Sequence, residues 1–181
     1  MTMSKKHLLL ACGLITILLT MTTQTGCNEV NPEYLVRLDS LDEKIVLTEK
    51  YLAIDYTTIA SREQYITKHL VYMAKYYDRT MTKDFGNNLT KYKAIKKTYA
   101  NFLNRYSDLV SETKALKTQA ADLRTSVTKN QITKAEFKQY YHAESTDIDE
   151  HLLFTKRLNQ SIHGLEPEYQ RISRMVGVEI V

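Results

Sequence analysis

The residues best spaced for metal chemistry lie in the segment HAESTDIDEH, residues 142–151. Glu144, Asp147 and His151 recur at spacings of three and four, which places them near one face of a helix. A di-iron bundle needs Glu-x-x-His on two helices and Glu on two others, and no second copy of the cluster occurs. We therefore interpret the segment as a solvated acidic face and expect neither metal nor cofactor. A four-helix metal protein built around Glu144 and His151 is the least favoured alternative.

The remaining reactive residue types do not form a catalytic pattern. His69, His142 and His163 have no Cys or second His at ligand spacing. The chain contains no Gly-x-Ser-x-Gly motif, no phosphate-binding Gly loop and no Cys–His pairing. We predict that the protein is not an enzyme.

Four lysines gather in the segment KYKAIKK, namely Lys91, Lys93, Lys96 and Lys97. With Tyr92 and Tyr99 as stacking groups, such a cluster could bind nucleic acid or anionic lipid. Both tyrosines belong to an apolar helical seam, however, so the lysines are better interpreted as a solvated helix face. The formal net charge of +4 includes Lys5 and Lys6 of the leader, and this balance does not indicate a nucleic-acid partner. The lysine cluster remains a candidate interaction tip.

Residues 1–26 have the layout of a secretory signal. A basic head of Lys5, Lys6 and His7 precedes an apolar run from Leu8 to Met21. A membrane-spanning helix needs about 20 apolar residues, so this run favours export followed by cleavage. Removal of the signal also removes Cys12, which leaves Cys27 without a partner for an intramolecular disulfide.

Cys27 is the candidate lipidation site. The pair Gly26-Cys27 resembles the end of the bacterial lipoprotein box, although Gln24 stands where that family usually has Leu. The resemblance implies a diacylglycerol on the Cys27 thiol, cleavage before Cys27, and an acylated tether over residues 27–31. Asn28 rather than Asp follows the Cys, which in enteric lipoprotein sorting implies the outer membrane. The alternative is a free thiol that follows an ordinary signal.

The scarcity of helix breakers predicts an all-α domain over residues 32–181. Asn31-Pro32 is a typical helix start, and the segment FGNN at 85–88 is the first typical stop, which predicts one helix over about 32–84. Apolar residues recur at every seventh position of this helix: Leu38, Ile45, Leu52, Ile59, Ile66 and Met73. A capping box at Ser61–Gln64 predicts, as the alternative, a break near 57–61 and four helices.

A second helix over about 88–128 carries the stronger seam, with apolar spacings that alternate between three and four. Its members are Tyr92, Ile95, Tyr99, Phe102, Tyr106, Leu109, Thr113, Leu116, Ala120, Leu123 and Val127. Asn130 marks a turn, and the capping box Thr133–Glu136 opens a third helix over about 133–163. A short segment at 167–176 follows. Short connections force neighbouring helices antiparallel, so we predict an elongated antiparallel bundle of three long helices with coiled-coil-like seams.

A leader with a lipoprotein-like box and a long helical hairpin resembles the helical lipoproteins of bacterial envelopes, especially those of Bacteroidetes. The resemblance implies a lipid-anchored location, with the outer membrane as the expected membrane, and no particular reaction. We expect a structural or protein-interaction module that contacts a protein partner or a second copy of itself. The alternative is an envelope chaperone that grips clients between its helical arms.

The lipidation site can be tested directly. Cys27→Ser should abolish labelling by a lipid precursor and move the protein from the membrane to soluble or uncleaved fractions. Each buried CH₂ of an acyl chain contributes about 0.8 kcal/mol to anchoring, so the loss should be conspicuous. A wild-type protein that takes no label, with a variant that stays membrane-bound, would make Cys27 an ordinary thiol.

Overall fold

The computed structural model describes residues 30–78 and 80–180, with side chains to residue 177. The predicted signal peptide, Cys27 and most of the predicted tether lie outside these residues. The described residues form helices and no strand: α2 (Pro32–Leu52), α3 (Tyr56–Tyr76), α4 (Lys83–Thr128), α5 (Lys134–Gly164) and α6 (Glu166–Ile180). The predicted all-α class is confirmed.

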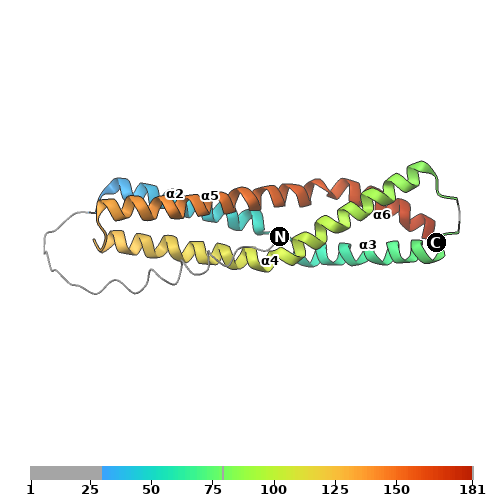
Figure 1. The fold of residues 1–181 in the computed structure, drawn as a ribbon, viewed down its shortest axis with the longest axis horizontal. Helices are drawn as coiled ribbons and strands as arrows, with labels where there is room; N and C mark the ends of the chain where they lie inside the picture. The colour runs from blue at the N-terminus through green and yellow to red at the C-terminus, as the bar shows by residue number, and fades with distance from the viewer. Residues whose placement is uncertain (1–29, 79, 181) are drawn as a thin grey trace.

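The helices form three long arms packed side by side (Figure 1). The first arm is α2 followed by α3, the second is α4 alone, and the third is α5 followed by α6. α2 and α5 run in the same direction, because Tyr34 stacks on Phe137 near their starts and Asn159 bonds Tyr51 near their ends. α4 runs antiparallel to both (Figure 1). The predicted elongated bundle of three long helices is confirmed.

The first arm is interrupted between α2 and α3, so the prediction of one unbroken helix over 32–84 is wrong. The break lies at 53–55, a few residues before the predicted alternative site, and Asp55 rather than Ser61 caps the new helix. The Asp55 side chain accepts a hydrogen bond from the Thr58 amide at 3.0 Å. Hydrogen bonds from Thr58 lower the Asp55 pKa to about 2.

Side chains from the other two arms stabilise this break. A helix end leaves carbonyl groups without partners inside the helix. The Tyr106 hydroxyl of α4 donates to the Leu52 carbonyl at 3.3 Å, and the Asn159 amide of α5 donates to the Tyr51 carbonyl at 2.8 Å. The seven-residue apolar spacing nevertheless continues across the break, since all six seam residues from Leu38 to Met73 are buried.

The connection between α3 and α4 also differs from the prediction. α3 ends at Tyr76 and α4 begins at Lys83, so FGNN lies in the first turns of α4 instead of ending the first arm. Thr82 caps α4 by accepting from the Phe85 amide at 3.3 Å. Phe85 and Leu89 are buried, and their burial favours an earlier helix start over the stop that Gly86 suggests.

The turn between α4 and α5 agrees with the prediction from the sequence. Asn130 adopts a left-handed conformation with φ of 53°, which Asn tolerates better than most residues. Thr133 and Glu136 form the predicted capping box at the start of α5.

The third arm is longer than predicted. Gly164 ends α5, but α6 begins at Glu166 with one residue between them, so the arm changes direction there without stopping. α6 also extends beyond the predicted range of 167–176. It buries Tyr169, Ile172 and Val176 in a core shared with α3 and α4.

Two separate hydrophobic cores occupy the two ends of the bundle. The proximal core, near Pro32, combines α2 with the second half of α4 and the first half of α5; it contains Leu38, Leu41, Ile45, Leu116, Ala120, Leu123, Val127, Phe137 and Ile148. The distal core combines α3 and α6 with the first half of α4 and the end of α5; it contains Ile54, Ile59, Ile66, Met73, Phe85, Leu89, Tyr92, Ile95, Tyr99, Phe102, Ile162, Tyr169, Ile172 and Val176. Only α4 runs the whole length of both. In the described part of the chain, no helix is both long and apolar enough to span a membrane.

The α4 seam should tolerate no charge. Leu109→Asp or Leu116→Asp places a carboxylate at a buried position, where it must lose its hydration or become protonated, and either costs about several kcal/mol. The thermal midpoint should fall by more than about 10 °C. Lys97→Glu, on the exposed face of the same helix, is the control and should melt like wild type. A Leu109→Asp variant with an unchanged melt would contradict the assigned seam.

Candidate functional site

A layer of buried polar side chains separates the two cores. It consists of Thr48 on α2, Thr113 on α4, and His151 and Thr155 on α5. The Thr48 and Thr155 hydroxyls donate to carbonyls of their own helices, those of Lys44 and His151, at 2.9 and 3.0 Å. The polar layer therefore satisfies its hydroxyls internally and interrupts the apolar packing near the break in the first arm.

His151 is the one titratable member of the polar layer. The Thr113 hydroxyl lies 2.8 Å from the Leu109 carbonyl, to which it donates, and its oxygen lies 2.8 Å from His151 Nε2, within hydrogen-bond distance. His151 Nδ1 lies 3.3 Å from Glu112 Oε2. A carboxylate only accepts hydrogen bonds, so the contact with Glu112 places a proton on Nδ1 of the ring. The hydrogen bond from His151 lowers the pKa of Glu112.

The structure separates the candidate ligands of the segment at 142–151. His151 points into the bundle and is 5% exposed, whereas Asp147 is exposed. Glu144 is half-buried, and its Oε2 has no hydrogen-bond partner. Among the described residues, no three His, Cys, Asp or Glu side chains are grouped to hold a metal ion.

The four lysines of the candidate tip do not act together in the structure. Lys91 pairs with Glu168 of α6 at 3.1 Å, and Lys96 lies 3.7 Å from Glu63 of α3. Lys93 and Lys97 are exposed. The α4 segment that carries the lysines lies in the half of the bundle opposite Pro32 (Figure 1), and Lys91 and Lys96 link α6 and α3 to α4.

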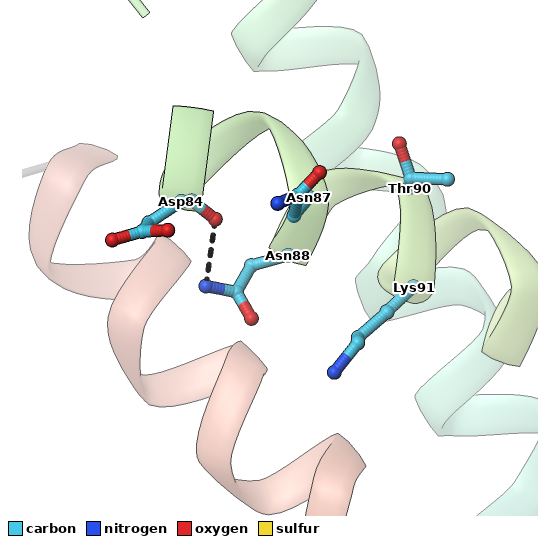
Figure 2. Close-up of a pocket in the computed structure, with 5 residues that line it drawn as sticks. All are labelled: Asp84, Asn87, Asn88, Thr90 and Lys91. Carbon is cyan, nitrogen blue, oxygen red and sulfur yellow. Dashed lines mark hydrogen bonds between the residues drawn. The ribbon is translucent and has the colours of Figure 1, made fainter. Parts of the chain in front are cut away.

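A polar hollow of about 600 Å³ lies at this end, lined by Asp84, Asn87, Asn88, Thr90 and Lys91 (Figure 2). The Asn88 amide donates to the Asp84 carbonyl at 2.9 Å, and the Lys91 side chain extends toward α6 (Figure 2). Asn88 Oδ1 accepts from Arg171 of α6. These contacts attach α6 to the start of α4.

The one basic residue that lines the hollow, Lys91, is paired with Glu168, which also pairs with Arg171. Arg171 first, then Lys91, lower the Glu168 pKa to about 2. No nucleophile with an adjacent base lines the hollow, so its geometry supplies no catalytic step. We interpret it as a helix junction rather than a substrate site.

A tyrosine row on α3 is the surface feature that the sequence interpretation missed. Tyr65, Tyr72 and Tyr76 are 43%, 39% and 56% exposed. With His69 between them they follow the spacing 4-3-4, which places all four on adjoining turns of one helix face. That spacing was readable from the sequence. The buried seam of Ile59, Ile66 and Met73 lies on a different face of α3, and the sequence interpretation considered only that seam.

Contacts within the fold hold the tyrosine row in place. Tyr65 packs on His69 with ring centroids 3.9 Å apart, and His69 Nδ1 lies 3.4 Å from the hydroxyl of buried Tyr92. The Tyr72 and Tyr76 rings lie 4.9 Å apart. Burial lowers the His69 pKa, which favours the neutral ring in this aromatic cluster.

Comparisons with known proteins identify no relative. No family model, curated protein or solved structure matches the chain.

The half-buried carboxyl of Glu144 should make the stability of the fold depend on pH. Burial first, and then the charge of Asp147, raise its pKa. A carboxyl whose pKa is higher in the folded state stabilises the fold at pH below its unfolded pKa, and this contribution is lost as pH rises through the folded value. Glu144→Gln should therefore raise the melting temperature at pH 7 by about 2–4 °C, the shift expected for ~1 kcal/mol in a chain of this size.

The advantage of Glu144→Gln should disappear below about pH 4, where the wild-type carboxyl is protonated. Glu150→Gln is the matched control, because Glu150 lies on the same helix and is exposed. Equal melting temperatures for Glu144→Gln and wild type from about pH 4 to pH 7 would show that burying the Glu144 carboxylate does not destabilise the fold.

Proposed function

We propose that the protein is a lipid-anchored helical rod of the bacterial cell envelope that binds protein partners through exposed helix faces. Cys27 supplies the membrane anchor, with the outer membrane as the expected location, and the described residues supply an extended scaffold. The proposal includes no cofactor, no nucleic-acid partner and no catalysis.

The distribution of exposed apolar side chains carries the proposal. Of the ten large apolar side chains that are exposed in the described residues, eight lie on the first arm: Val36, Val46, Leu47, Tyr56, Tyr65, Val71, Tyr72 and Tyr76. None lies on α4, although α4 is the longest helix. Apolar residues concentrated on one arm are typical of an interaction surface, whereas scattered ones need no explanation.

The packing favours a rod over the alternative chaperone. A chaperone that grips clients between arms needs apolar space between them. Here the facing seams are buried against one another over both cores, and ion pairs such as Lys44–Asp149 and Lys117–Glu49 link neighbouring arms at 2.7 Å. The proposal therefore places partners on the outside of the bundle.

Native gel electrophoresis of envelopes extracted in mild detergent tests the proposed function. The wild-type protein should migrate in a discrete complex much larger than its own 21.0 kDa, and Cys27→Ser should reduce the complex by lowering the local concentration at the membrane. Migration as a free monomer would contradict the proposal. Efficient suppression of aggregation of an unfolded client by the purified protein would favour the chaperone instead.

A further inference from the structure

The outer face of α3 combines aromatic and basic side chains without an acidic one. Glu63 is the only acidic residue of Tyr56–Tyr76, and it faces Lys96 of α4. Lys68 and Lys75 are exposed and alternate with Tyr65 and Tyr72 at spacings of three and four. The Lys75 amine lies 5.0 Å from the centre of the Tyr76 ring. The tyrosine row is thus bordered along one edge by two lysines that pair with no carboxylate in the described part of the chain.

We propose that the tyrosine row is the docking site for an acidic amphipathic helix of another protein. This inference rests on the proposed function and names the surface and the class of partner. The apolar side chains of the partner helix lie on Tyr65, Tyr72 and Tyr76, and its carboxylates pair with Lys68 and Lys75.

The dimensions of the row fit a helix. From Tyr65 to Tyr76 the row spans about 16 Å, or three turns, at 1.5 Å per residue. An amphipathic partner helix presents apolar side chains at spacings of three and four along one face, and the row at positions 65, 69, 72 and 76 has the same spacing. The rings are already stacked on His69 and on each other, so binding immobilises few additional side chains.

Charge decides between this partner and a second copy of the chain. An interface between two copies of the same face would bring the lysines of both copies together. Like charges at such an interface oppose association, whereas an acidic partner gains attraction and a faster encounter. The absence of any acid on this face therefore favours a different protein.

The composition of the row also favours a protein helix over a membrane surface. An interfacial helix inserts an apolar face of Trp, Phe or Leu about 5–10 Å into the lipid boundary. The row offers Tyr rings with polar hydroxyls, and the rest of α3 is packed on α4 and α6. Rigid tyrosines of this kind are enriched at protein interfaces.

Site-specific photo-crosslinking of the full-length, acylated protein in its native envelope tests the inference. A photoreactive phenylalanine derivative replaces Tyr72, and separate variants carry it at Tyr56, Val36 and Leu153, which are exposed away from the row. Mass spectrometry identifies what each position captures. We expect position 72 to crosslink to an acidic, helix-forming segment of one other protein.

Charge reversal provides the second arm of the test. Lys68→Glu with Lys75→Glu should reduce the crosslink at position 72 by at least ~10-fold, because attraction at the rim becomes repulsion. The matched control is Lys93→Glu with Lys97→Glu, two exposed lysines of α4, which should leave it unchanged. Both double variants should melt like wild type. A crosslink that survives Lys68→Glu with Lys75→Glu would overturn the acidic-partner assignment.

Other products separate failure of the inference from failure of the proposed function. A phospholipid or a second copy of the chain at position 72 overturns the inference. Crosslinks to protein at the other positions, with none at 72, also overturn it but leave an interaction rod in place. An absence of protein crosslinks at all four positions overturns both.

Discussion

The apolar seam of α4 is the constraint on which the rest of the structure depends. Every other helix contacts α4, and each of the two cores contains residues from it. Bulky Tyr92, Tyr99 and Phe102 fill the distal core, whereas Ala120 in the proximal core permits closer packing. Because α4 is uninterrupted for 46 residues, the breaks in the other arms do not separate the two ends.

The polar layer and the interruption of the first arm lie between the two cores and divide the bundle into two packing units. Cores separated in this way can open independently, because local opening follows the boundaries of cooperative packing. The residues that stabilise the bundle therefore differ from the residues that are exposed for binding. Lys91 and Asn88 of α4 hold α6 against the distal core through Glu168 and Arg171, while the outer face of the first arm keeps its apolar and aromatic side chains exposed.

Features encoded by neighbouring residues were predictable from the sequence. Asn31-Pro32, the Thr133–Glu136 capping box and the α4 seam each depend on residues a few positions apart, and each was predicted correctly. The predicted position of the break in the first arm was wrong. The side chains of Tyr106 and Asn159, which donate hydrogen bonds to the end of α2, come from 54 and 108 residues away in the sequence. The acidic partners of Lys91 and Lys96 likewise belong to other helices, so the lysines looked like one cluster in the sequence.

The central claim is that the uninterrupted α4 holds the two cores together along the full length of the bundle, and hydrogen exchange measured peptide by peptide tests it most directly. Amides of α4 around Thr113 should exchange only with global unfolding, although the polar layer surrounds them. Amides at 53–55 and at the turn before Lys83 should exchange much sooner through local opening. Exchange around Thr113 as fast as at 53–55 would contradict the claim, since α4 would then not be continuously stable between the two ends.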